Sequence, residues 1–347
     1  MWDLDYYDHC VRADDHDVDV NEVAAYLPLE AIFIGLLTLS ADVFGLRYEE
    51  SGAPHAWHPD VRLFAVLDRT SGAELGWFYA DLHPRPGKYG DDMAEPLRLP
   101  RLGRDGRRES GVAAMVMNLP APTQSGPARL QHEDMVVLFH EFGDVLHELL
   151  GTNAYHGTSM VFVEDDFVET PSQVMENWAW DPETLVRISR HAETGAAMPR
   201  ALAERVAASR GVNRASRELT YLAGNSAFDQ RVHGPSEADL DDAMLASDSL
   251  RGLPTVNGTF WPASFTHLVG GYDAGYYGYL WSLVLACDLW SRFAEDVFSP
   301  GVGASYREYV LEAGASRDAA HLAASFLGRQ STNDAFFHLL GIVGFGG

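Results

Sequence analysis

The residues with the clearest capacity for chemistry lie in one short run, His140-Glu141-Phe142-Gly143-Asp144. On a helix, the pattern H-E-x-x-H places two imidazoles one turn apart to ligate zinc, with the glutamate beside the metal as general base. Here a carboxylate, Asp144, takes the place of the second imidazole. His140 and Asp144 would share a helix face, with Glu141 about 100° around the helix at the edge of a metal site. A third ligand must come from elsewhere, and Glu169 is the candidate. The alternative is an ordinary solvated helix face.

A helix from Gln131 to Leu150 would carry this run. Apolar residues recur there at three- and four-residue spacing, and Gly151 is a typical C-terminal stop. Residues 1–50 are also predicted to be helical, with the clearest periodicity over 20–46. The same signals predict further helices over residues 172–180, 182–191, 200–210, 214–230, 236–247, 279–293 and 319–327.

Strand signals are fewer. Residues 61–67 and 75–82 are rich in branched and aromatic side chains and are joined by a turn-like segment, which predicts a hairpin. Residues 111–119 are a further short strand candidate. Residues 84–110 are rich in Pro, Gly, Arg and Asp and are predicted to form a long surface loop. The sequence therefore predicts a mainly α fold with a small β-sheet, in a single domain over residues 1–347.

Composition excludes several partners. The chain has 50 acidic and 25 basic residues, a net charge of −25, which repels nucleic acid and anionic membranes. The longest apolar stretch, residues 27–46, is interrupted by charged and polar side chains and favours a buried helix over a membrane span. Cys10 and Cys287 offer neither metal-ligand spacing nor a disulfide framework, and the N-terminus lacks a signal-peptide pattern. These features fit a cytoplasmic protein.

Longer motifs around the run resemble those of the thimet-oligopeptidase-like (M3) metallopeptidases. Residues 139–143 resemble the zinc helix of that family, as do residues 130–134 upstream and 166–178 downstream. The Gly/Tyr-rich segment 264–281 is similar to the family's substrate loop. Residues 26–30 and 79–90 also look like family segments, and the similarity extends from about residue 2 to about residue 342.

The resemblance implies a zincin-like, multi-helical catalytic domain that acts on short peptides with Zn²⁺ as cofactor. His140 and Glu169 match zinc ligands of the family, and Glu141 matches its general base. Phenols on a glycine-rich loop are good neutral donors toward a developing oxyanion, and the glycines would let the loop close over substrate. The residues that match the family's substrate-binding and intermediate-stabilising side chains are His267, Tyr272, Tyr276 and Tyr279.

The aspartate at position 144 departs from the family pattern. Zinc with two histidines and one carboxylate carries one positive charge, whereas His140, Asp144 and Glu169 would make the centre formally neutral. A less positive centre polarises a carbonyl less and lowers the pKa of water less. An oxygen-rich site also favours harder metals such as Mn²⁺. We therefore expect weaker zinc binding and slower amide hydrolysis, or a different reaction.

Three further features bear on the site. His147 could replace the missing imidazole, but the family has histidine there without a ligand role, so we expect it to pack or to orient Asp144 or Glu169. Asp91-Asp92 stand where the family's turn usually continues with histidine, after Lys88, the sole lysine. The chain is about half the family's length, so the N-terminal family half is expected to be absent. An open cleft could accept bulkier substrates, or it could pair with a second copy or a separate partner chain.

Three functions remain open from the sequence. The first is a metal-dependent hydrolase that cleaves short peptides with a metal-activated water and Glu141 as general base. The second is a repurposed enzyme of the same scaffold with different chemistry on a peptide-like metabolite, such as a natural-product tailoring step. The third is a catalytically inactive, peptide-binding pseudo-peptidase. Retention of Glu141, Glu169 and the tyrosine loop favours the first.

Overall fold

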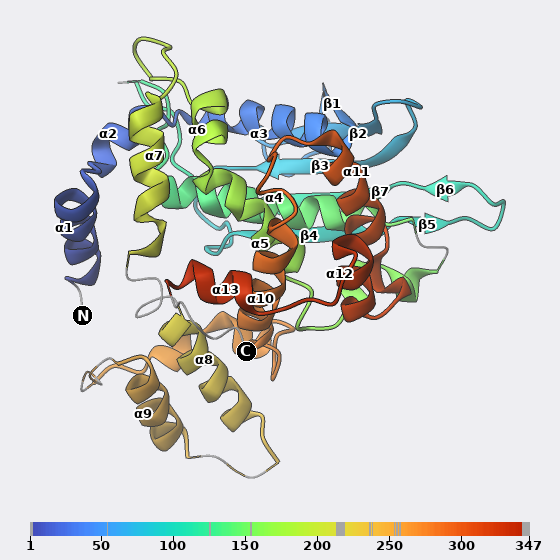
Figure 1. Cartoon of the computed structure of the whole chain (residues 1–347). Helices are drawn as coiled ribbons and strands as arrows, with labels where there is room; N and C mark the ends of the chain where they lie inside the picture. Colours follow the sequence, from blue (N-terminus) through green and yellow to red (C-terminus); the bar gives the residue numbers. More distant parts are fainter. Residues whose placement is uncertain are drawn as a thin grey trace.

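The computed structural model describes residues 3–341 except 54, 125, 153, 154, 213–218, 236, 238, 253, 255 and 257. Helices dominate the described part, and a small five-stranded sheet accompanies them, as predicted, together with a two-stranded hairpin (Figure 1). The α-helices are α1 (Leu4–His16), α2 (Val20–Ala24), α3 (Leu29–Phe44), α4 (His132–Leu150), α5 (Thr170–Trp180), α6 (Pro182–Ile188), α7 (Arg200–Ala208), α8 (Thr220–Val232), α9 (Leu240–Leu250), α10 (Gly278–Trp290), α11 (Pro300–Tyr306), α12 (Ala319–Leu327) and α13 (Asp334–Leu339).

A five-stranded sheet has the order β1-β2-β3-β7-β4. Its strands are β1 (Leu46–Ser51), β2 (Arg62–Asp68), β3 (Glu74–Asp81), β7 (Gly111–Val116) and β4 (Met93–Arg98). The predicted β2–β3 hairpin is present, with Phe64 opposite Phe78. Strands β3 and β7 are parallel, and β4 lies antiparallel to β7 at the edge of the sheet. In the part of the chain that the structure describes, the other edge of β4 pairs with no strand.

Packing between the sheet and α4 fixes the helix that carries the candidate site. The buried ring of Phe142 on α4 lies 5.8 Å from the ring of Phe78 on β3 and 6.0 Å from that of Tyr48 on β1. Aromatic pairs at these separations add to the free energy gained by burying their apolar area. The large core continues through α3, α5, α10 and α12. Rotation of α4 about its axis would expose this cluster.

Two segments differ from the sequence prediction. Residues 84–110 are not one long loop, because they contain β4 and a small hairpin of β5 (Arg101–Leu102) and β6 (Arg108–Glu109). The sequence did not predict β4 because Pro96 is unusual within a strand. Proline is tolerated there because β4 is an edge strand. Residues 46–51 form β1 rather than helix, since Gly45 ends α3 in the left-handed region with φ 67°.

A second, smaller core joins α8 and α9, which lie together at the bottom of Figure 1. Phe228, Ala243 and Met244 are its buried members, and Trp261 and Phe265 pack against it. This unit supports the start of the Gly/Tyr-rich segment. The predicted helix over 214–230 falls partly on residues 213–218, which lie outside the described residues, and α8 begins at Thr220.

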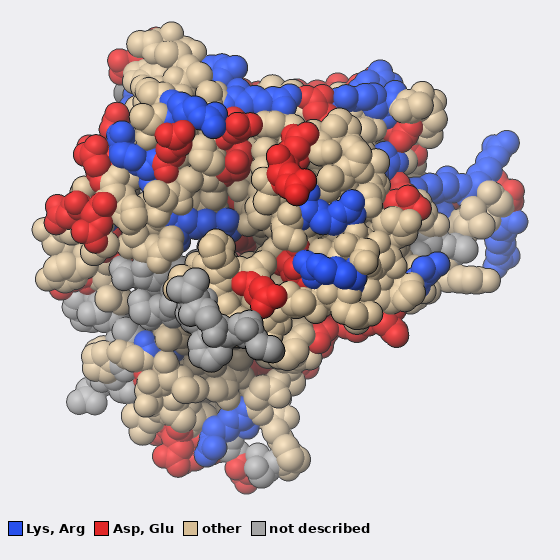
Figure 2. All heavy atoms as spheres, in the orientation of Figure 1, with Lys and Arg blue, Asp and Glu red and all other residues tan. Residues whose placement is uncertain are grey.

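Charge is distributed unevenly over the surface. Figure 2 shows acidic and basic side chains interspersed over one face, with basic atoms gathered on the projecting β5–β6 hairpin. That hairpin carries Arg101, Arg104, Arg107 and Arg108. Among the described residues, every helix is too short or too polar to cross a lipid bilayer.

Candidate metal centre

Helix α4 and the segment before α5 bring the predicted ligands together. The backbone N–H of Gln131 donates to the Asp134 carboxylate over 2.8 Å at the start of α4, which anchors its first turn. A side chain at Gly143 would place its Cβ 2.6 Å from Ser172 Cα, so only glycine lets α5 approach this closely. Glu169, directly before α5, is thereby held against the face of α4.

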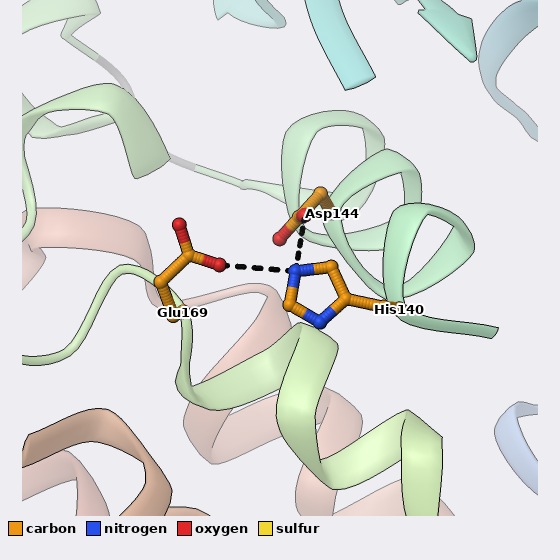
Figure 3. Close-up of side chains that lie close together, drawn as sticks. All are labelled: His140, Asp144 and Glu169. Carbon is orange, nitrogen blue, oxygen red and sulfur yellow. Dashed lines mark ion pairs between the residues drawn. The ribbon is translucent and has the colours of Figure 1, made fainter. Parts of the chain in front are cut away.

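His140, Asp144 and Glu169 converge on one point (Figure 3). His140 Nε2 lies 3.2 Å from Glu169 Oε2 and 3.8 Å from Asp144 Oδ2. One ligand atom from each residue lies within 4.8 Å of those of the other two. The three side chains are only 18%, 19% and 5% exposed, in that order. The His-plus-carboxylate grouping expected from helical spacing thus exists in three dimensions.

The donor set and its spacing fit a divalent metal ion. Nitrogen and oxygen ligands at the usual zinc distances are separated by about 3.4 Å when the geometry is tetrahedral. The measured separations of 3.2 and 3.8 Å lie on either side of this value. One imidazole and two carboxylates suit Zn²⁺, and the oxygen-rich set also suits Mn²⁺.

The imidazole of His140 is held between carboxylates. Its Nδ1 donates to Glu176 Oε1 over 2.8 Å, on the side away from Glu169. Burial lowers the pKa of His140, but Glu169 and Glu176 outweigh burial and hold that pKa well above its usual range. The surroundings of His140 Nε2 therefore favour positive charge. A carboxylate on the far nitrogen of a ligating histidine fixes the ring and increases its basicity.

Glu169 is oriented by two hydroxyl groups. Tyr272 donates its phenolic O–H to Glu169 Oε1 over 2.5 Å, and Ser172 donates to Oε2 over 3.2 Å. Burial raises the pKa of Glu169, but the His140 imidazole and the Tyr272 hydroxyl outweigh burial and lower that pKa. Glu169 is thus an ionised carboxylate with fixed orientation, as a metal ligand must be.

The remaining acids of α4 are partly neutralised by burial. Burial raises the pKa of Glu141 to about 7; His140 opposes the shift, and Glu169 and Asp92 add to it. The backbone N–H of Ala94 on β4 also opposes the rise in the pKa of Glu141, so β4 lies beside this carboxyl group. A carboxyl group poised near neutral pH is suited to general base work. Burial and the charge of Glu169 hold the pKa of Asp144 well above its usual range.

The aromatic side chains of the Gly/Tyr-rich segment form one cluster. The rings of Tyr272 and Tyr279 stack with centroids 5.3 Å apart, and Tyr279 Oη lies 3.3 Å from His267 Nε2. Tyr276 is buried and packs behind them, 5.1 Å from the ring of His267. Tyr272 therefore touches a candidate ligand directly, whereas Tyr276 supports the cluster.

Backbone contacts hold this segment in place. Asp229 accepts the N–H of Ala274 over 3.0 Å and that of Tyr276 over 3.1 Å. Gln173 on α5 donates to the carbonyl of Tyr279 over 2.9 Å. The loop is therefore tied to α8 on one side and to α5 on the other.

The turn around Lys88 is structural. Lys88 Nζ donates to the Asp81 carboxylate over 3.0 Å and to the carbonyls of Asp81, His83 and Met117. These hydrogen bonds hold the turn against the ends of β3 and β7. Beyond the turn, Asp91 accepts the hydroxyl of Thr266 over 3.1 Å, which joins this side of the site to the aromatic segment.

The structure narrows one expectation about a neighbouring residue and adds two roles that were not predicted. His147 orients neither Asp144 nor Glu169, because both of its ring nitrogens are buried without a hydrogen-bond partner in the described structure. Of the two roles expected for His147, packing remains. The roles of Glu176 and Ser172 were not predicted from the sequence. A signal for Glu176 exists, since it follows Glu169 by seven residues, two turns along the helix that begins there.

The chain is similar to known proteins over nearly its whole length. The family model described as peptidase family M3 matches residues 1–342. Saccharolysin of Saccharomyces cerevisiae is 35% identical over 99% of this chain and 50% of its own length. Oligopeptidase A of Escherichia coli is 34% identical over 99% of this chain and 51% of its own length. The chain thus spans about half the length of the curated relatives it matches. On the extent of the family match and the identity to these relatives, the chain belongs to peptidase family M3.

Proposed function

We propose that this chain is a single metal-dependent catalytic domain that hydrolyses peptide bonds of short peptides. The observation that carries the proposal is the convergence of His140, Asp144 and Glu169 next to the buried carboxyl of Glu141. His140, Asp144 and Glu169 would hold the metal, with Zn²⁺ first and Mn²⁺ second. The names of its relatives, saccharolysin and oligopeptidase A, fit a peptidase.

Different residues of the chain have different roles in the proposed reaction. A bound zinc ion would supply a Lewis acid that polarises the scissile carbonyl and makes water more acidic. Glu141 takes a proton from the attacking water on its carboxylate and delivers it to the leaving nitrogen. Tyr279 and His267 act as donors toward the oxyanion that develops on the carbonyl oxygen. Tyr272 holds Glu169 and Tyr276 supports the aromatic cluster, so both position the acting groups.

The free edge of β4 offers a path for the substrate backbone. In the described part of the chain, β4 pairs with a strand on one side only, that of β7, and the backbone N–H of Ala94 on β4 lowers the pKa of the nearby Glu141. Extended peptides bind at exposed sheet edges through main-chain hydrogen bonds. A peptide along β4 would therefore pass directly over the general base.

Asp144 favours a second candidate function. With two carboxylates the metal centre is formally neutral, and a neutral centre activates an amide less than a positive one. Amide hydrolysis is a demanding reaction, so the same site could serve a different reaction on a peptide-like metabolite or bind peptides without turnover. The Asp144→His variant separates these functions, because it restores the imidazole pair expected of a zinc peptidase helix.

The test is peptide cleavage by the zinc-loaded chain. We expect the parent to cleave quenched-fluorescent peptides and Glu141→Gln to lose about 10²-fold or more in kcat/KM. Glu133→Gln, on the same helix but exposed at its first turn, is the matched control and should keep the parental rate. Cleavage by Asp144→His without cleavage by the parent would overturn peptide hydrolysis as the native function.

A further inference from the structure

Glu148 is a buried acid that the proposed chemistry does not use. It follows Asp144 by four residues and Glu141 by seven on α4, so all three lie on adjoining parts of one helix face. Glu148 is only 3% exposed. Its Oε2 has no hydrogen-bond partner in the described structure.

The ionisable groups that act on Glu148 are all acids. The ionisable groups that act on it are Asp144, Glu95 and Glu141, and burial together with these charges holds the pKa of Glu148 well above its usual range. Glu95 lies on β4, which packs along α4, and it is exposed. In the described part of the chain, neither Glu148 nor Glu95 forms an ion pair with an arginine, lysine or histidine.

Buried acids away from the site have partners in the described structure. Asp81 is paired with Arg85 and Lys88, and Asp288 is paired with Arg329. The two acids of the nearby turn are also occupied: Asp91 by a threonine hydroxyl and Asp92 by the backbone N–H of Asn118. Glu148 differs from these acids because its Oε2 is buried without a donor in the described structure.

We propose that Glu148 and Glu95 form a subsite for a basic side chain, a guanidinium or ammonium group, of the bound peptide. The inference rests on the proposed function, because it places the peptide along β4 beside Glu141. The exposed Glu95 and the buried Glu148 would contact a side chain of the peptide close to the scissile bond. A buried carboxylate without a partner is costly, and an incoming cation supplies both the missing charge and the missing donor. A guanidinium group can donate to both carboxylates at once.

The experiment compares arginine with citrulline, which has nearly the same shape and no charge. Quenched-fluorescent peptides carry one or the other at each of the three positions on either side of the cleaved bond. For the zinc-loaded parent, we expect arginine at one position to raise kcat/KM about tenfold or more over citrulline. Glu148→Gln should bring this ratio close to one, and Glu95→Gln should lower it.

The control and a binding measurement make every outcome decisive. Glu133→Gln removes the same charge from the same helix and should keep the parental ratio, which excludes a general effect of net charge. A ratio near one at every position in the parent, or an unchanged ratio in Glu148→Gln, would overturn the subsite. Calorimetric titration with the same peptides covers the case of no cleavage. Tighter binding of the arginine peptide that is lost in Glu148→Gln would then support the subsite while the proposed hydrolysis fails, and equal binding would refute the subsite.

Discussion

Tyr272 donates its phenolic O–H to Glu169 over 2.5 Å, so the Gly/Tyr-rich segment is bonded directly to a candidate metal ligand. The bond joins two segments that are more than a hundred residues apart in the chain. It couples the position of the aromatic cluster to the orientation of the Glu169 carboxylate. Changes in the loop should therefore alter metal affinity as well as catalysis.

Removing the Tyr272 hydroxyl tests this coupling. In Tyr272→Phe the ring remains but Glu169 loses a donor, and loss of such a supporting hydrogen bond typically lowers metal affinity about 10-fold to 100-fold. Zinc affinity is measured by competition with a chromogenic chelator. Tyr277→Phe, at an exposed tyrosine of the same segment, is the control. Equal affinities for the parent and Tyr272→Phe would show that the hydroxyl does not orient the ligand.

Glu176 should matter in the same way from the opposite side. Its carboxylate accepts from His140 Nδ1 over 2.8 Å, which leaves Nε2 directed at the metal position. Replacement by leucine removes the acceptor, and we expect zinc affinity to fall about 10-fold to 100-fold. Glu183→Leu, at an exposed site on α6, controls for the loss of charge. An unaltered affinity in Glu176→Leu would rule out this orienting role.

Gly143 sets the distance between α4 and α5. An added Cβ would lie 2.6 Å from Ser172 Cα and 3.0 Å from the carbonyl of Pro171. We expect Gly143→Ala to lower the free energy of unfolding by about 1–3 kcal/mol, as overpacking does, and to weaken zinc binding by displacing Glu169. Urea denaturation and chelator competition measure the two effects. Gly157→Ala, where an added Cβ meets nothing within 4 Å, should be close to neutral; a neutral Gly143→Ala would contradict the close approach.

His147 should make the protein sensitive to acid. Burial lowers its pKa to about 4, below the usual value of 6.5, so between these pH values the unfolded chain binds the proton more strongly than the folded one. Its contribution to stability is therefore present above pH 6.5 and is lost as pH falls toward 4, by about 3 kcal/mol in total. The free energy of unfolding of His147→Leu should fall less steeply over this window than that of the parent. Parallel pH profiles would contradict the assignment.

The part of this site that lies on α4 can be predicted from the sequence, because it depends on one helix alone. The four-residue spacing of His140 and Asp144 places both on one face of any helix, and Glu141 follows beside them. The approach of Glu169 depends on the packing of α5 against Gly143, which spacing alone does not describe. The family resemblance supplied that residue.

The remaining features depend on β4. Its sequence, with Pro96 among charged residues, has the composition of a loop, and only pairing with β7 makes it a strand. The effect of Ala94 on the pKa of Glu141 and the burial of Glu148 both follow from α4 packing along this strand. His147 has the residue type of a ligand, but its burial is a property of the whole core.

The central claim is that Asp144 joins His140 and Glu169 in holding one divalent metal ion. The most direct measurement is the metal content of the purified chain by mass spectrometry after equilibration with zinc and removal of free ions. We predict about one zinc ion per chain in the parent, as expected for a mononuclear site, and a large loss of metal in Asp144→Asn, which keeps the shape of the side chain but not its charge. A parent without bound metal, or an Asp144→Asn variant that retains it fully, would contradict this account.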